Sequence, residues 1–102
     1  MSVGRQNNIT VSEPNDYSNA KVMLHPHALE RVIERGCTME EVIDTVRSGE
    51  QFLAKFGRQG FRKNFSFEQA WRGKYYSSKQ VEVFAVKAAQ DWLVLTVITR
   101  YF

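Results

Sequence analysis

The order of two hydrophobic patterns along the chain is the feature that most limits its fold. Apolar residues recur at helical spacing between residues 24 and 48, and from residue 51 onward they alternate or form short apolar runs. Helical segments followed by strand segments are typical of α+β folds. We therefore expect an α+β domain in which two N-terminal helices pack on a twisted, mostly antiparallel sheet of four or five strands.

The two expected helices have recognisable ends. Pro26 suits the first turn of a helix, where its missing N–H is not needed, and Gly36 suits the position just past the end. Thr38 and Glu41 then have the spacing of a capping box, which predicts the start of a second helix. The inner face of the first helix is predicted to consist of Leu24, Ala28, Leu29, Val32 and Ile33.

The rest of the chain is predicted to form strands over residues 51–56, 61–67, 71–77, 81–88 and 92–101. In the second of these, Phe61, Phe65 and Phe67 share one parity and polar residues share the other, as in a half-buried strand. The last segment is almost entirely β-branched or aliphatic, which favours a central strand buried on both faces.

One domain accounts for the length of 102 residues. Residues 1–21 are polar and lack apolar periodicity, so we expect a flexible arm or linker there, with a short extended piece at residues 9–11 as an alternative. Residues 22–102 form the expected domain. The longest apolar run, residues 92–98, is far shorter than the roughly 20 residues of a membrane span, so no membrane partner is expected.

Cysteine and histidine are scarce in the chain. Cys37 is the single cysteine, so it cannot form an internal disulfide, and with two histidines it cannot complete a four-ligand zinc site. His25 and His27 could ligate a metal together, but no aspartate or cysteine spacing nearby supports such a site. We predict a domain without metal or cofactor, in which Cys37 packs as a small apolar side chain.

Charge is distributed unevenly, although the net charge is only +3. Residues 13–50 hold eight acidic and four basic residues, whereas residues 55–79 hold seven basic residues and one acid. A basic segment with interleaved Phe and Tyr is expected where phosphates and bases are both bound; the alternative is a solvated strand face. The residues predicted to bind RNA are Lys55, Arg58, Arg62, Lys63, Arg72, Tyr75, Tyr76 and Lys79.

One face of the first helix combines a histidine with two arginines. The spacing i, i+4, i+7 and i+8 places on it His27, Arg31, Glu34 and Arg35. Histidine can transfer a proton near neutral pH, and arginine matches phosphate oxygens in bidentate fashion. The combination is therefore suited to phosphodiester cleavage, which needs proton transfer and charge stabilisation. In the structural alternative, Glu34 pairs with one of the arginines on a solvated helix surface.

Residues 71–76, Trp-Arg-Gly-Lys-Tyr-Tyr, place aromatic and cationic side chains close together. Aromatic stacking, with phosphate contacts from Arg72 and Lys74, would suit single-stranded RNA. The alternative assigns Trp71 and one tyrosine to the core and the cations to solvent. In the last strand, Thr99 lies where a buried strand can present polar groups at the edge of a cleft.

Two groups of residues resemble a known family. Residues 27–36, His-Ala-Leu-Glu-Arg-Val-Ile-Glu-Arg-Gly, and residues 38–42, Thr-Met-Glu-Glu-Val, resemble the opening motif of small bacterial toxin domains. Residues 71–76, 79–83 and 94–99 are similar to the remainder of that pattern. The similar domains are BrnT- and RelE-type toxins and the C-terminal nuclease modules of polymorphic or contact-dependent growth-inhibition toxins, within the barnase–EndoU–colicin–RelE assemblage.

The resemblance implies a RelE/barnase-like fold and metal-independent cleavage of tRNA or another structured RNA. Attack by the ribose 2′-hydroxyl would leave a 2′,3′-cyclic phosphate. Carried onto this sequence, the family pattern makes His27 the proton-transfer residue. Arg31, Arg35 and Lys74 would bind phosphate and stabilise charge. Thr99 would position the scissile group.

The resemblance also implies a setting for this activity. The toxin would act in the bacterial cytoplasm, either as a free-standing protein or delivered there as part of a secreted toxin. A cognate antitoxin or immunity protein, expected to be acidic because the chain is basic, would neutralise it. Two alternatives remain open: a non-catalytic toxin that acts by binding its target, and an RNA-binding or regulatory module without toxicity.

Overall fold

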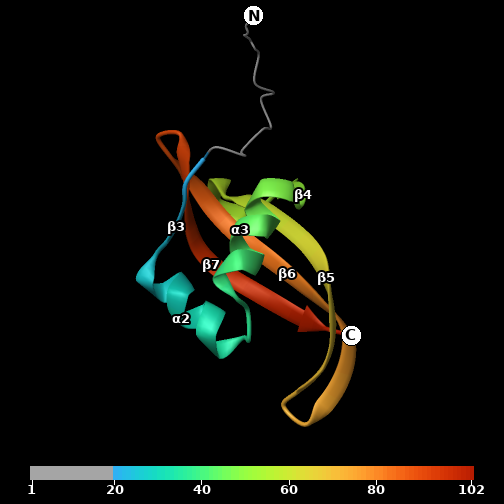
Figure 1. Cartoon of the computed structure of the whole chain (residues 1–102). Helices are drawn as coiled ribbons and strands as arrows, with labels where there is room; N and C mark the ends of the chain where they lie inside the picture. The colour runs from blue at the N-terminus through green and yellow to red at the C-terminus, as the bar shows by residue number, and fades with distance from the viewer. Residues whose placement is uncertain (1–19) are drawn as a thin grey trace, which may run out of the picture.

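The computed structural model describes residues 20–102, which form one sheet with two helices against it (Figure 1). In chain order the elements are β3 (Val22–Leu24), α2 (Pro26–Glu34), α3 (Met39–Ser48), β4 (Glu50–Leu53), the 3₁₀ turn η1 (Lys55–Gly57), β5 (Gln59–Trp71), β6 (Lys74–Ala88) and β7 (Asp91–Tyr101). The strand order across the sheet is β3-β7-β6-β5-β4.

The core lies between the helices and one face of the sheet. The register pairs Phe61 with Val83 and Val83 with Val97, so these three fully buried side chains form a row across β5, β6 and β7. Val42 and Val46 of α3 pack into the same cluster from the helix-covered side of the sheet. Because side chains alternate along a strand, the residues between these positions point to the opposite face, which no helix of the described residues covers (Figure 1).

Local sequence chemistry sets the helix ends. Pro26 opens α2, and the His25 Nδ1 atom accepts a hydrogen bond from the His27 backbone N–H at 3.1 Å. At α3 the capping box is complete, with Thr38 N donating to Glu41 Oε1 at 3.0 Å and Glu41 N donating to Thr38 Oγ1 at 3.1 Å. These contacts satisfy N–H groups that have no partner within their own helix.

The buried stripe of α2 is narrower than the sequence predicts. Ala28 and Val32 are buried, but Leu29 and Ile33 are 46% and 74% exposed. Helical periodicity does not say which part of a wide apolar stripe meets the sheet, and here α2 packs on β7 through one edge of the stripe.

The expected fold class is wrong. The helices are not N-terminal elements, because strand β3 precedes them and α2 begins only at Pro26. The sheet is mixed rather than mostly antiparallel, because β3 runs parallel to β7. Strands also dominate, with 13, 15 and 11 residues in β5, β6 and β7 against 9 and 10 in the helices. The RelE/barnase-like architecture that the resemblance implied is therefore not retained.

The expected strand boundaries also need correction. Residues 74–77 of one predicted segment and residues 81–88 of the next belong to one continuous strand, β6, whereas the segment predicted at 61–67 extends through Trp71 as β5. Arg72 and Gly73 form the turn between them, both with positive φ (52° and 85°), as in a two-residue hairpin of type I′. Residues 51–56 divide into β4 and the turn η1.

The β5–β6 hairpin bends before its tip. The register shifts between Ser66 and Gln69, where Glu68 has a φ of 50°. An extra residue in one strand bends a hairpin and increases its twist. The outer part of the hairpin extends beyond the helices at the same end of the molecule as the C-terminus (Figure 1).

The predicted arm at residues 1–21 lies mostly outside the described residues, as does the alternative extended piece at 9–11. Lys21 is described, and it is held to the start of β7. Its backbone N–H donates to Asp91 Oδ1 at 3.0 Å, and its carbonyl accepts from Trp92 N at 2.9 Å.

Candidate functional site

Helix α2 presents its histidine and two arginines as a row along one side. His27 lies in the first turn and is exposed, Arg31 is half-buried one turn further on, and Arg35 caps the C-terminal end. At 1.5 Å of rise per residue, the row is about 12 Å long. The sequence prediction that these residues share one face agrees with this helix, whereas their functional roles are untested.

The two arginines already have partners within the protein. Arg31 Nη1 forms an ion pair with Glu34 Oε1 at 2.6 Å, which is the structural alternative considered from the sequence. Arg35 Nη1 donates to the carbonyl oxygen of Val97 on β7 at 2.6 Å. Both guanidinium groups retain further N–H donors for an incoming phosphate, but at Arg31 the phosphate would compete with the negative charge of Glu34.

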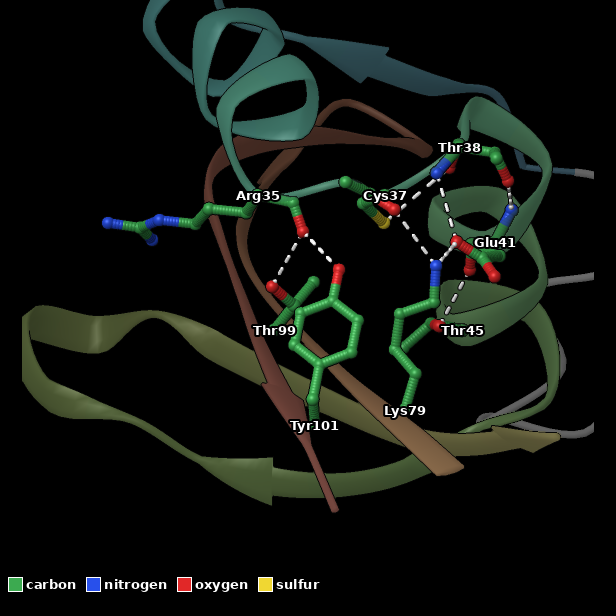
Figure 2. Close-up of polar contacts among 9 residues, drawn as sticks. Arg35, Cys37, Thr38, Glu41, Thr45, Lys79, Thr99 and Tyr101 are labelled. Carbon is green, nitrogen blue, oxygen red and sulfur yellow. Dashed lines mark hydrogen bonds and ion pairs between the residues drawn. The ribbon is translucent and has the colours of Figure 1, made fainter. Parts of the chain in front are cut away.

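A pair of hydroxyl groups on β7 fixes the C-terminal end of α2. The Arg35 carbonyl oxygen accepts hydrogen bonds from Thr99 Oγ1 at 2.9 Å and from Tyr101 Oη at 2.6 Å (Figure 2). In Figure 2 the guanidinium of Arg35 points away from these hydroxyls. Thr99 is thus brought next to Arg35, but its hydroxyl is engaged with the backbone and acts here as a positioning group.

A buried ammonium holds the turn between α2 and α3. Lys79 is 3% exposed, and its Nζ lies 2.9 Å from both the Gly36 carbonyl oxygen and Glu41 Oε1 (Figure 2). The same ammonium lies 4.9 Å from the centre of the Phe67 ring. Lys79 was predicted to bind RNA; at this position its charge is already paired and shielded from solvent.

Gly36 is required in this turn for two reasons. Its φ of +71° is a conformation that other residues rarely adopt. A Cβ atom there would also lie 2.6 Å from both the Trp71 ring and the Tyr101 hydroxyl. The turn is therefore packed directly against the β5–β6 hairpin and β7.

Cys37, which follows Gly36, is buried, and its thiol is expected to be unreactive. Its Sγ lies 3.6 Å from the Thr38 carbonyl oxygen. Burial, followed by the negative charge of Glu41, raises the pKa of the Cys37 thiol to about 12 from an ordinary 9.0. A thiol that stays protonated is a poor nucleophile, which agrees with a packing role.

We predict that native Cys37 resists alkylation at pH 9. Half of an ordinary thiol is thiolate at that pH, whereas a pKa of about 12 leaves roughly one part in a thousand. Cys37 should therefore be alkylated by iodoacetamide several hundred-fold more slowly in the native protein than in urea. The raised pKa of this thiol also stabilises the folded state. That stabilisation is fully present below pH 9 and is lost as the pH rises from 9 to about 12. Equal native and unfolded rates at pH 9 would contradict the burial of this thiol.

The hairpin brings further cationic and aromatic groups to the end of α2. Arg72 Nη2 donates to the Glu34 carbonyl oxygen at 2.9 Å. Trp71 stacks on Tyr101, with ring centres 5.2 Å apart and an interplanar angle of 18°. Lys74, beyond the turn, lies with its ammonium 5.5 Å from the centre of the Tyr76 ring. This arrangement matches the structural alternative for residues 71–76, in which Trp71 packs inward and the cations face solvent, whereas RNA binding by these residues is untested.

The other predicted RNA-binding residues lie elsewhere. Lys63 pairs with Asp44 of α3 at 2.9 Å, on the helix-covered face. Lys55 begins the η1 turn that follows β4, and Arg58 comes directly after this turn. Arg62 lies on the face that no described helix covers, and Tyr75 is exposed near the hairpin tip. The eight residues therefore do not form one surface.

An ion-pair cluster on the open face was missed from the sequence. Glu82 is buried, and its two oxygens pair with Arg62 Nε at 2.8 Å and Arg100 Nη1 at 2.5 Å. Desolvation raises the pKa of Glu82, but the hydrogen bonds from Arg100 and Arg62 outweigh it and hold this pKa below its usual range. The available signal was the position of Glu82 between Val81 and Val83, which places its side chain on the opposite face.

No group of three or more His, Cys, Asp or Glu side chains within residues 20–102 is arranged to hold a metal ion. Over the same range, no helix is long and apolar enough to cross a membrane. No protein-family model, curated protein or solved structure matches the chain.

Proposed function

We propose that this protein is a metal-independent endoribonuclease that acts as a toxin on tRNA or another structured RNA. The observation that supports this most is the row of His27, Arg31 and Arg35 along α2, extended at its C-terminal end by Arg72 of the hairpin. A proton-transfer group beside several guanidinium groups is what cleavage of a phosphodiester requires.

The proposed reaction needs groups of this chain and one water molecule. The His27 imidazole accepts the proton of a ribose 2′-hydroxyl, and the 2′ oxygen forms a bond to the adjacent phosphorus. The bond from phosphorus to the 5′ oxygen breaks, and this oxygen takes a proton from water. The hydroxide left behind takes the proton held by His27, which restores the neutral imidazole. Arg31 and Arg35 stabilise the negative charge on the phosphoryl oxygens, while Lys74 holds a neighbouring phosphate. The products are a 2′,3′-cyclic phosphate and a 5′-hydroxyl.

Incubating the purified protein with total cellular RNA in EDTA tests this proposal. We expect discrete new fragments with cyclic phosphate ends. RNA that is bound but remains intact would contradict the enzymatic function.

One observation favours a second candidate, RNA binding without cleavage. The His27 ring is exposed, and within residues 20–102 no side chain hydrogen-bonds to it. Catalytic bases are usually oriented by a third group. A protein that only binds would retain RNA on a filter with a steep dependence on salt, give no fragments, and keep its affinity in His27→Ala.

The ion pair between Arg31 and Glu34 gives a prediction about RNA affinity. Glu34→Gln frees Arg31, so the affinity for a non-cleavable 2′-O-methyl RNA should rise about two- to fivefold. Fluorescence anisotropy at fixed salt measures this. Glu30→Gln is the matched control, because it removes the same charge from α2 without breaking an ion pair among the described residues. Equal gains in the two variants would contradict a phosphate-binding role for Arg31.

A further inference from the structure

An exposed aromatic side chain projects from the η1 turn and has a left-handed backbone conformation. Phe56 is 86% exposed and has φ 62° and ψ 33°, in the left-handed region. Two backbone hydrogen bonds close the turn around it, from Arg58 N to Lys55 O at 3.2 Å and from Ala54 N to Arg58 O at 3.0 Å. Strained backbone conformations are concentrated at functional sites, so Phe56 is a candidate for a ligand contact.

Phe56 borders a hollow of about 430 Å³ that is built on the open face of the sheet. The register aligns Phe52, Gly60, Phe84 and Thr96 in one row across β4, β5, β6 and β7. The Phe52 and Phe84 rings meet edge to face, with centres 5.9 Å apart. The row forms an aromatic floor, and Phe56 stands at its side.

Gly60 is the residue that makes room for this floor. A Cβ atom at position 60 would lie 2.3 Å from the Phe52 ring. The Phe52 ring therefore lies across the backbone of β5, where any side chain would displace it.

The charges around the hollow favour an anionic ligand. Lys55 and Arg58 line it, and within the described residues neither forms an ion pair with a carboxylate. The Arg58 guanidinium lies 5.7 Å from the centre of the Phe56 ring. Arg62, 4.3 Å from the centre of the Phe52 ring, is already paired with Glu82 and Glu50. Aromatic faces beside unpaired cations match a ligand that has a flat base and a phosphate.

We propose that this hollow binds one nucleobase of a single-stranded RNA segment. The base stacks on Phe56 above the floor of Phe52 and Phe84, and Lys55 and Arg58 contact the flanking phosphates. The inference rests on the proposed function in that RNA is the ligand. It adds a second contact on the sheet face opposite α2, so that one RNA molecule must reach both faces.

The test compares two fluorescent oligomers of equal length and charge. One is a 2′-O-methyl oligoadenylate, which cannot be cleaved by 2′-hydroxyl attack, and the other carries abasic residues throughout. We expect the wild type to prefer the strand with bases, and Phe56→Ala to reduce this preference about tenfold. Phe56→Leu should lose as much, because it keeps apolar bulk but no aromatic face, while Phe56→Trp retains the preference. Ile33→Ala, at an exposed apolar residue of α2, should change neither affinity.

The outcomes separate this site from the proposed enzyme. A wild type that prefers bases through Phe56 but leaves natural RNA intact supports the base site and contradicts the ribonuclease. A wild type that cleaves RNA, with the preference unchanged in Phe56→Ala, overturns the base site alone. If Phe56→Leu keeps the full preference for the strand with bases, base stacking on Phe56 is overturned. An apolar side chain of a partner protein would then be the better candidate ligand of the hollow. Absence of binding to either strand also overturns the site.

Discussion

Lys79→Met is expected to lower the free energy of unfolding by about 3 kcal/mol. The substitution keeps the length of the side chain but removes an ammonium that is buried between the Gly36 carbonyl and the Glu41 carboxylate. Breaking a buried ion pair by removing one partner costs about 3–5 kcal/mol, and Glu41 retains some exposure, which favours the lower end. Urea denaturation followed by circular dichroism measures the change.

Lys63→Met is the matched control for this prediction. Lys63 also pairs with a carboxylate of α3, but the side chains of Lys63 and Asp44 are 31% and 48% exposed. Exposed ion pairs contribute at most about 1 kcal/mol, so the loss should be much smaller. Equal losses in the two variants would show that burial does not distinguish Lys79.

His27→Ala should reduce RNA cleavage by about 10²- to 10⁴-fold, the range expected for loss of a proton-transfer group. The side chain is exposed on the first turn of α2, so the fold should be unaffected. Single-turnover cleavage assays measure the rate constant.

His25→Asn is the control for the histidine prediction. The His25 ring caps α2 by accepting from His27 N, and asparagine can accept the same hydrogen bond. The variant should keep both the helix and the cleavage rate. A loss equal to that of His27→Ala would mean that the helix terminus, rather than the His27 ring, is what matters.

The helix ends and the alternating strand could be predicted from the sequence because each depends on residues close together in the chain. Pro26, Gly36 and the capping box at Thr38 define helix ends through backbone chemistry within a few residues. The alternation of Phe61, Phe65 and Phe67 reports one strand directly. None of these signals depends on a distant partner.

The features that the sequence did not reveal depend on distant contacts. Strand β3 has only three residues, too few to show a period, and it exists because Val22 and Leu24 pair with β7. The sequence pattern predicts two strands where β6 is continuous, because polar residues from Ser77 to Gln80 interrupt the apolar pattern. Their partners on β5 and β7 maintain the ladder through this interval.

The candidate site shows the same division. Helical spacing sufficed to place His27, Arg31 and Arg35 in one row. Charge counting along residues 55–79 did not separate the buried Lys79 from the exposed Lys74, because burial depends on which face of β6 meets α3. The contact between Arg72 and α2 depends on a hairpin turn that composition does not reveal.

Cleavage of RNA by the residues of the α2 row can be tested through the chemistry of the product ends. Wild type and His27→Ala would be incubated with deproteinised tRNA in EDTA, and the new 3′ ends identified chemically. We predict 2′,3′-cyclic phosphate ends from the wild type and almost none from the variant. Equal amounts of product from both proteins, or intact tRNA with both, would contradict the claim.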